Sequence, residues 1–129
     1  MPNVRELVGT PYKVHGRTKE EGFDCYGLIK ECVRQDYGVE LPDYNYKNLN
    51  EQEYVRNQLH LLANVEKIDN LEKNCIIELS EKGIPMHVGY YIGDGLFIHS
   101  LARFGTIVEP IRRWEKRLLG VYKVKNSSL

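Results

Sequence analysis

The sequence has no long apolar run, no excess of either charge and few cysteines. Its 129 residues contain nothing close to the roughly 20 consecutive apolar residues that a membrane-spanning helix needs. The opening segment, MPNVRELVGTPY, also lacks the apolar core of a secretory signal. We therefore expect a soluble chain that is cytoplasmic as synthesised and has no encoded export signal.

The sequence also has no excess of positive or negative charge. The 18 Lys and Arg residues balance the 18 Asp and Glu residues. No overall field would draw the chain to nucleic acid or to an anionic membrane, and we expect neither as a partner. With 129 residues and 42% hydrophobic composition, the chain has the size and core content of one globular domain, which we place over residues 1–129.

The chain contains only three cysteines, so they cannot all pair. Cys25 and Cys32 would lie about 10 Å apart along a helix. A disulfide needs Cα atoms within about 7 Å. Reduced thiols are therefore the simpler interpretation, and the question becomes what chemistry they perform.

The clearest helical pattern is the segment GFDCYGLIKECVRQDYG, residues 22–38. Asp24 is a good N-cap and Gly38 a good residue to end the helix, which predicts a helix over 25–37. Cys25 would then be the first helical residue, where the helix dipole and unpaired backbone N–H groups favour the thiolate. The alternative is a small core residue on the apolar stripe of Cys25, Leu28, Ile29, Cys32, Val33 and Tyr37.

The second half of the chain has a different pattern. Residues 41–58 are polar and rich in tyrosine, which predicts a loop followed by a short helix through Leu61 or Leu62. Short apolar runs then follow, separated by turns at 82–85 and 93–95; the runs are CIIEL, HVGYYI, LFIHS, TIVEP and GVYKV. A helical first half followed by an antiparallel sheet predicts an α+β fold.

Two histidines in these runs could activate a cysteine. A Cys nucleophile requires an imidazole to take its proton and a third group to orient that imidazole. His87 and His99 are the candidates, although either one alone is more simply an ordinary sheet residue. We assign His15 and His60 to the surface or to packing.

The turn between these histidines decides whether they can meet. A three-residue loop, 93–95, would pair Ile92 with Leu96 and place His99 opposite Gly89. His87 and His99 would then share a face at a Cα separation of roughly 7 to 8 Å, with Gly89 leaving room between them. A two-residue loop would place the two imidazoles on opposite faces.

Four motifs in this order resemble the NlpC-type cysteine peptidases. They are Gly9-Thr10-Pro11-Tyr12, Phe23-Asp24-Cys25-Tyr26-Gly27-Leu28-Ile29, His87-Val88-Gly89-Tyr90-Tyr91-Ile92-Gly93 and Phe97-Ile98-His99-Ser100. The resemblance spans roughly residues 5 to 124. Each motif alone is weak to moderate, but four in the same order are a strong signal.

The resemblance implies a papain-like α+β fold, in which an N-terminal helix carrying the nucleophile packs on a C-terminal antiparallel sheet. Cys25 would attack a peptide carbonyl, His87 would act as general base and then acid, and His99 would orient His87. No cofactor and no metal are implied. Family members commonly cleave the bond between γ-D-glutamate and a diamino acid in bacterial cell-wall stem peptides, which implies peptidoglycan as the substrate.

The resemblance also implies residues on the substrate side. Tyr12 matches a tyrosine that lines the site or helps to hold the oxyanion. Asp24 matches an acidic residue that can bind a free amine of the substrate, but a helix cap explains it equally well. Tyr26 replaces the Ser that many members have, so the usual substrate pocket is altered. Cys75 stands where the family has Asp and is interpreted as a buried strand residue.

Within the family, the chain looks most like phage tail-associated cell-wall hydrolases. The features are Tyr26, the Gly-Thr-Pro-Tyr opening and the segment Leu41-Pro42-Asp43-Tyr44. This likeness implies phage tail proteins as partners. It also implies delivery to the cell wall by a phage particle or an injection device.

Other interpretations of the same residues stay open. Cys25, His87 and His99 are also a plausible zinc ligand set with one open position, although no close-spaced ligand pair supports it. A non-catalytic tail or interaction protein could keep the fold, and a thiol hydrolase could act on an amide outside the cell wall. Lipid-directed acyltransferases on a rearranged fold place the histidine strand before the cysteine helix, and the order here is the reverse.

The segment PIRRWEKRL is the main basic cluster of the chain. It could recognise anionic wall polymer or nucleic acid. The simpler interpretation is the solvated face of a short helix that Trp114 anchors to the protein.

Overall fold

A computed structural model describes residues 2–43, 65–81 and 84–125 of the chain. The elements run in the order α1 (Val4–Leu7), β1 (Arg17–Thr18), β2 (Gly22–Phe23), α2 (Cys25–Tyr37), β3 (Val65–Ile68), β4 (Cys75–Glu81), β5 (Ile84–Gly93), β6 (Leu96–Leu101), β7 (Gly105–Pro110), η1 (Ile111–Arg113), η2 (Glu115–Arg117) and β8 (Leu118–Val124). None of the helices in the described part of the chain has the length and apolar character needed to cross a bilayer. The short helix predicted before Leu62 lies outside the described residues.

Helix α2 has the predicted bounds. It begins at Cys25, and the side chain of Asp24 caps it by accepting a hydrogen bond of 2.7 Å from the backbone N–H of Gly27. It ends at Tyr37, and the next residue, Gly38, has a φ of 66° in the left-handed region that glycine adopts without strain. The apolar stripe predicted from the sequence is buried from Cys25 to Val33, whereas Tyr37 at its end is only partly buried.

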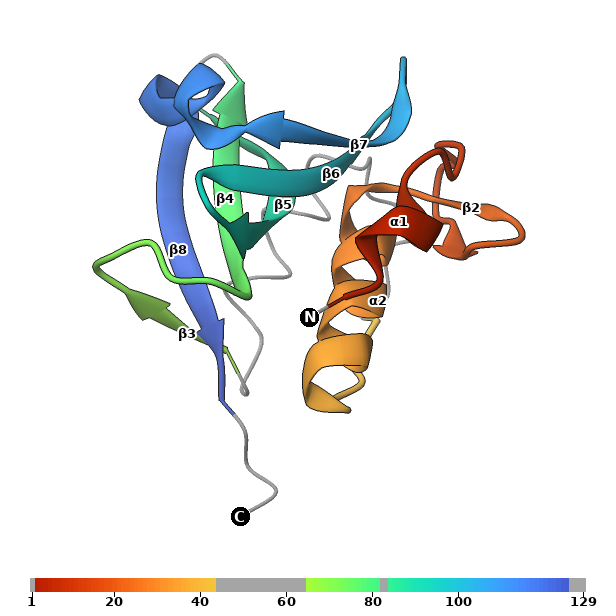
Figure 1. The fold of residues 1–129 in the computed structure, drawn as a ribbon, viewed down its shortest axis with the longest axis horizontal. Helices are drawn as coiled ribbons and strands as arrows, with labels where there is room; N and C mark the ends of the chain where they lie inside the picture. The colour runs from red at the N-terminus through yellow and green to blue at the C-terminus, as the bar shows by residue number, and fades with distance from the viewer. Residues whose placement is uncertain (1, 44–64, 82–83, 126–129) are drawn as a thin grey trace.

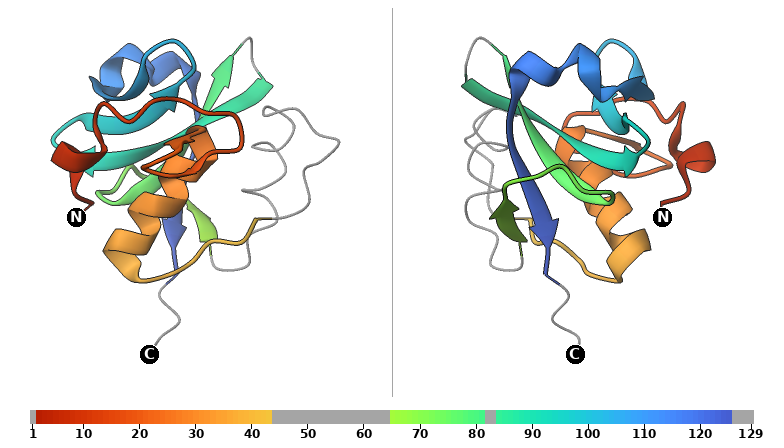
Figure 2. Two further views of the ribbon diagram at one scale, coloured as in Figure 1. Left: turned by 90° about the vertical axis from the view of Figure 1, so that its right-hand side faces the viewer. Right: turned by 60° about the vertical axis from the view of Figure 1, so that its left-hand side comes forward.

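The described residues form an α+β fold with a six-stranded antiparallel sheet and a two-stranded sheet of β1 and β2. The large sheet has the strand order β3-β8-β4-β5-β6-β7. Helix α2 packs against β5 and β6 and forms a second layer (Figure 1). Figure 2 shows the same two layers from other sides. The predicted fold class is therefore confirmed, although the edge strand β3 was not predicted.

The sheet separates two apolar cores because alternate residues of its strands face opposite sides. The first core joins α2 to side chains such as Val88, Tyr90 and Ile98. The second lies on the other face and contains Phe97, with Trp114 packed against it. The cysteine helix and Trp114 therefore cover opposite faces of the sheet.

The turn between β5 and β6 differs from the prediction. Gly93 pairs with Leu96, so the turn consists of Asp94 and Gly95 alone, with φ values of 56° and 75°. A register shift at Ile92 adds one residue to β5. This bulge offsets the shorter loop, and the strands return to the expected register beyond it. Both histidines therefore still face one side, but the bulge and not a three-residue loop is the reason.

The β4–β5 connection also differs from the prediction at its second half. Ile84 and Pro85 belong to β5, where Ile84 pairs with Glu81 and Pro85 with Ser80. The predicted turn at 82–85 is therefore wrong for these two positions. A register shift beside Ser80 accommodates the proline, in line with the tendency of prolines in sheets to occur at irregularities.

Candidate active site

Cys25 lies where the first turn of α2 meets the sheet. Its side chain is 1% exposed, and backbone hydrogen bonds from Val88 and Tyr26 reach the sulfur. The described pairing of β5 with β6 ends at Tyr90 and Ile98, so the two strands have parted at the level of Val88. The helix start therefore meets β5 directly beside His87, the residue before Val88.

The electrostatics of Cys25 oppose the expected thiolate. Burial and, to a lesser degree, the negative charge of Asp24 raise the pKa of its thiol to about 12. The backbone hydrogen bonds and the positive charge of Arg17 act in the opposite direction but are weaker. The backbone N–H group of Tyr26 at the helix start favours the thiolate, as predicted, but burial outweighs it and the pKa of Cys25 is raised. At neutral pH Cys25 is a protonated thiol.

His87 and His99 form the predicted pair. Nε2 of His87 lies 2.8 Å from Nδ1 of His99, within hydrogen-bonding distance. Burial and the charge of His99 lower the pKa of His87 to about 3, although the charge of Glu109 raises it. Burial lowers the pKa of His99 to about 4. Both imidazoles are therefore neutral at neutral pH.

Glu109, which was not among the residues predicted from the sequence, extends this pair. Its Oε2 lies 2.9 Å from Nε2 of His99 and accepts a hydrogen bond of 2.7 Å from Nε1 of Trp114. Glu109 pairs with Phe97 across β6 and β7, which makes it a diagonal neighbour of His99 on the same face. The signal in the sequence was a carboxylate within the apolar run TIVEP.

Aromatic rings enclose the two histidines. The ring centre of Phe97 lies 4.3 Å from that of His99, and the Trp114 ring lies 5.2 Å from His99 and 5.8 Å from His87. Gly89 makes room for Phe97, because a Cβ atom at this position would lie 2.7 Å from the Phe97 ring. The prediction that Gly89 leaves space was right, but the ring that fills it belongs to Phe97.

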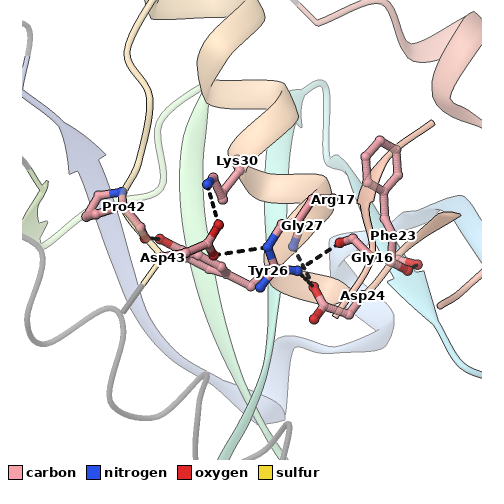
Figure 3. A network of polar contacts seen from close by, with 10 residues as sticks. Gly16, Arg17, Phe23, Asp24, Tyr26, Gly27, Lys30, Pro42 and Asp43 are labelled. Atoms are coloured by element: carbon pink, nitrogen blue, oxygen red, sulfur yellow. Dashed lines mark hydrogen bonds and ion pairs between the residues drawn. The ribbon is translucent and has the colours of Figure 1, made fainter. Parts of the chain in front are cut away.

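Asp24 is bound on the helix side of the cysteine. Its Oδ1 accepts hydrogen bonds from Gly27 and from Nη1 of Arg17, the latter at 2.8 Å (Figure 3). Asp43 forms two ion pairs: its Oδ1 lies 3.0 Å from Nε of Arg17, and its Oδ2 lies 2.7 Å from Nζ of Lys30. These contacts confirm the helix-cap interpretation of Asp24, whereas amine binding by Asp24 stays a prediction.

The two tyrosines predicted on the substrate side have different settings. Tyr26 is 1% exposed, and its hydroxyl donates a hydrogen bond of 2.9 Å to the carbonyl of Pro42. Tyr12 is half-buried and forms a β-bridge with Phe23, two residues before Cys25. The substrate roles of both tyrosines stay predictions.

The remaining candidate groups lie apart from this centre. Cys75 is buried in β4 as predicted, and the three cysteines are free. His15 is exposed as predicted, whereas His60 lies outside the described residues. Within the described ranges, no group of three or more His, Cys, Asp and Glu is arranged to hold a metal ion.

The basic segment near the histidines forms two short 3₁₀ helices, η1 and η2, in place of one predicted helix. Its Arg and Lys side chains are exposed, and the guanidinium of Arg117 lies 4.9 Å from the centre of the Trp114 ring. The prediction that Trp114 anchors a solvated basic face is confirmed.

A helix that begins with a cysteine and packs on an antiparallel sheet with a buried histidine pair defines a papain-like α+β protein. Within this class, the chain belongs to the NlpC/P60 family, whose sequence model matches residues 9–123. The family expected from the four motifs is therefore confirmed.

Curated relatives carry names that refer to the cell wall or to glutamyl bonds. The chain is 28% identical over 119 residues to murein DD-endopeptidase MepS/murein LD-carboxypeptidase of Escherichia coli (strain K12), covering 91% of this chain and 57% of that protein. It is 28% identical over 128 residues to gamma-DL-glutamyl hydrolase of Bacillus subtilis (strain 168), covering 94% of this chain and 28% of that protein. The chain thus spans about half or less of these relatives.

Solved structures share the fold. The NlpC/P60 domain of the peptidoglycan hydrolase SagA has a TM-score of 0.66 at 16% identity, over 94% of this chain and 92% of that chain. A lipoprotein-like NLP/P60 protein of Staphylococcus aureus subsp. aureus Mu50 has a TM-score of 0.67 at 22% identity, over 95% of this chain and 39% of that chain.

Proposed function

We propose that the chain is a cysteine-type endopeptidase that hydrolyses an amide bond in bacterial cell-wall stem peptides, between γ-D-glutamate and the diamino acid. Cys25 is the nucleophile, His87 the general base and His99 the residue that orients His87. The observation that supports the proposal is the backbone hydrogen bond from Val88 to the Cys25 sulfur, because Val88 follows His87, one member of the hydrogen-bonded histidine pair.

The proposed reaction begins from a neutral thiol and a neutral imidazole. Sγ of Cys25 attacks the carbonyl carbon while its proton moves to His87, and the carbonyl oxygen becomes an oxyanion. The backbone N–H of Cys25, at the positive end of the helix dipole, is the proposed donor for this oxyanion. His87 then protonates the leaving amine, and water hydrolyses the thioester to restore the thiol.

Starting from neutral groups has a reason in this site. A resting ion pair between Cys25 and His87 would place two charges in a buried position, and the pKa shifts of both residues oppose it. When the proton moves from Cys25 to His87 during the attack, no thiolate forms beforehand. The negative charge develops on the carbonyl oxygen of the substrate. General-base catalysis of this kind contributes about 10² to 10⁴ in rate.

The substrate class rests on family membership and on the relatives. Murein is named in the Escherichia coli relative and a γ-glutamyl bond in the Bacillus subtilis relative. Their names differ in the bond cleaved, so the bond in this proposal is the one that the sequence motifs imply.

Mass spectrometry of stem peptides and purified cell-wall fragments tests the proposal. The fragments are incubated with the wild-type chain and with Cys25→Ala in reductant, both with and without chelator. We expect cleavage beside γ-D-glutamate by the wild type alone. Cleavage that chelator abolishes would favour the metal alternative, and loss of all cleavage by both chains would favour a non-catalytic protein or an amide outside the wall.

Delivery by a phage tail rests on the likeness of Tyr26, the Gly-Thr-Pro-Tyr opening and the Leu-Pro-Asp-Tyr segment to tail-associated hydrolases. The test is co-purification of the tagged chain with assembled tail particles, with a chain lacking residues 41–44 as the control. Absence of the chain from intact particles would contradict this part of the proposal.

A further inference from the structure

A continuous line of hydrogen bonds runs outward from His87. It passes from Nε2 of His87 to Nδ1 of His99 at 2.8 Å, and from Nε2 of His99 to Oε2 of Glu109 at 2.9 Å. Trp114 closes the line by donating its indole N–H to the same Oε2 at 2.7 Å. The line of hydrogen bonds therefore ends at Oε2 of Glu109, which accepts from Trp114.

The contact with Trp114 shows what Oε2 of Glu109 does in this line. An indole nitrogen is a donor only, so Oε2 of Glu109 must act as an acceptor in this contact. Its second lone pair faces Nε2 of His99. Nε2 of His99 must therefore carry a proton and donate it. Glu109 is not a donor in this contact, because it acts on His87 as a negative charge and an ionised carboxylate has no proton to donate.

The tautomer of His99 then determines the tautomer of His87. A neutral His99 with a proton on Nε2 has a bare Nδ1, which can only accept. Nε2 of His87 must donate to it and so carries the proton of that ring. Nδ1 of His87 is left with a free lone pair, and this is the atom that can take a proton from a thiol.

We propose that Glu109, held in place by Trp114, is a positioning residue that acts through His99 to fix the tautomer of His87 and so makes Nδ1 of His87 the base for Cys25. This inference rests on the proposed function in that the base acts in amide hydrolysis. The proton moves from Sγ of Cys25 to Nδ1 of His87 as the carbon–sulfur bond forms, and it leaves on the amine nitrogen.

The surroundings of Glu109 fit this role. Its side chain is 19% exposed, and Nη1 of Arg113 lies 3.9 Å from its other oxygen, Oε1. When His87 takes the proton, the negative charge of Glu109 also stabilises the imidazolium, because this charge raises the pKa of His87. Without a carboxylate at 109, His99 can reverse its tautomer, and His87 would then carry its proton on the nitrogen needed as the base.

The first test needs no substrate. ¹⁵N-histidine labelling and two-bond ¹⁵N–¹H correlation spectra of the free protein report which ring nitrogen carries the proton. We expect both His87 and His99 in the Nε2–H form. In Glu109→Gln, whose amide can donate to His99, we expect His87 to shift to the Nδ1–H form in part or in full. Finding His87 as Nδ1–H in the wild type would overturn the proposal.

The second test is a double-mutant cycle on cleavage. Glu109→Gln should lower kcat about 10²-fold at unchanged KM, whereas Glu115→Gln, on the exposed η2, should leave kcat unchanged. In a His99→Asn background Glu109→Gln should cost no further activity, because its effect passes through His99. An equal loss in both backgrounds would contradict the proposal.

A third variant covers the case in which Glu109→Gln does not fold. Trp114→Phe removes the donor that holds Glu109 and should mix the tautomers; unmixed tautomers in Trp114→Phe would contradict the role of Trp114. If the wild type cleaves no stem peptide, the proposed function fails, while the spectra of the free protein still decide the assignment for Glu109.

Discussion

Asp24 and Arg17 form an ion pair of 2.8 Å directly before the cysteine at the start of α2. The pair sets two opposing charges beside the thiol, because Asp24 raises the pKa of Cys25 and Arg17 lowers it. The same carboxylate caps the helix. Asp24 thus stabilises the helix that presents Cys25 while it disfavours the thiolate of that residue.

Replacing Asp24 by Asn separates these two effects. Asn still caps a helix but carries no charge, so the pKa of Cys25 should fall. At a fixed pH between about 7 and 9, alkylation of Cys25 by iodoacetamide should accelerate, by about tenfold for each unit of pKa. Mass spectrometry of the peptide that contains Cys25 measures the rate.

The matched control is Asp43→Asn. It removes a different carboxylate of the same network, which lies 3.0 Å from Arg17, and it leaves in place Asp24, whose charge acts on the thiol. Its alkylation rate should stay close to that of the wild type. In the wild type the rate should rise with pH through this range. A plateau from acid pH upward would show a resting ion pair and contradict the neutral starting state.

Cys25→Ala and Cys32→Ala form a second comparison on one helix. Both cysteines are buried on the same stripe of α2, and Cys25 receives a hydrogen bond from the backbone of Val88, the residue after His87. Cys25→Ala should abolish cleavage in a folded protein and, as a truncation of an equally buried side chain, lose about 1 kcal/mol in the free energy of unfolding. Cys32→Ala should keep cleavage and lose about 1 kcal/mol in the free energy of unfolding. Full activity of Cys25→Ala would remove Cys25 as the nucleophile.

The two histidines should differ in their effect on cleavage. His87→Ala removes the proton acceptor and should lower kcat by about 10² to 10⁴. His99→Asn should cost less, since it removes only the group that orients His87. Steady-state kinetics of each variant, with circular dichroism to confirm the fold, measure the difference. An equal loss would mean that His99 does more than orient its neighbour.

Much of the fold was predictable because its signals are local. The cap at Asp24, the glycine at 38 and the apolar stripe between them set the bounds of α2, and the structure has the same bounds. The strands of the second half were also found by their apolar runs. The edge strand β3 was not predicted, because its four residues, VEKI, are too few and too polar to form a pattern.

The candidate site was predictable only in part, because its remaining features depend on contacts between distant residues. The bulge at Ile92 accompanies the short Asp94-Gly95 turn and has no signal in the apolar pattern. Glu109 lies beside His99 only through the register of β6 with β7. The raised pKa of Cys25 reflects burial, which local sequence does not report.

The buried histidine pair should make stability depend on pH. Because the pKa of each histidine is lowered on folding, the unfolded chain binds more protons than the folded chain below about pH 6.5. The stability that the two neutral histidines contribute is fully present above that pH and is lost as the pH falls toward about 4. Each histidine should contribute up to about 1.4 kcal/mol per pH unit within this window.

Urea unfolding at pH 7, 6 and 5 measures the effect. The double variant His87→Gln/His99→Gln lacks both imidazoles of the buried pair and should lose less stability over this range than the wild type. Carboxylates elsewhere act equally in both proteins, so the difference isolates the pair. Parallel curves for the two proteins would contradict the lowered pKa values.

Gly89→Ala tests whether packing against Phe97 holds the histidine pair in place. A Cβ at position 89 would lie 2.7 Å from the Phe97 ring, which must then shift, and this ring lies 4.3 Å from the ring of His99. We expect a loss of about 1 to 3 kcal/mol from overpacking. We also expect a fall in kcat larger than any fall in folded protein, because the His99 ring moves with Phe97.

Gly95→Ala is the control for backbone strain alone. Gly95 has a φ of 75° and open space where a Cβ would lie, so alanine should cost about 1 kcal/mol through its conformation. The turn lies at the far end of β5 and β6 from His87 and His99, and kcat per folded molecule should stay at the wild-type value. If Gly89→Ala also kept wild-type kcat, the position of Phe97 would not govern the geometry of the pair, and the hydrogen bonds to Glu109 and His87 would hold His99 by themselves.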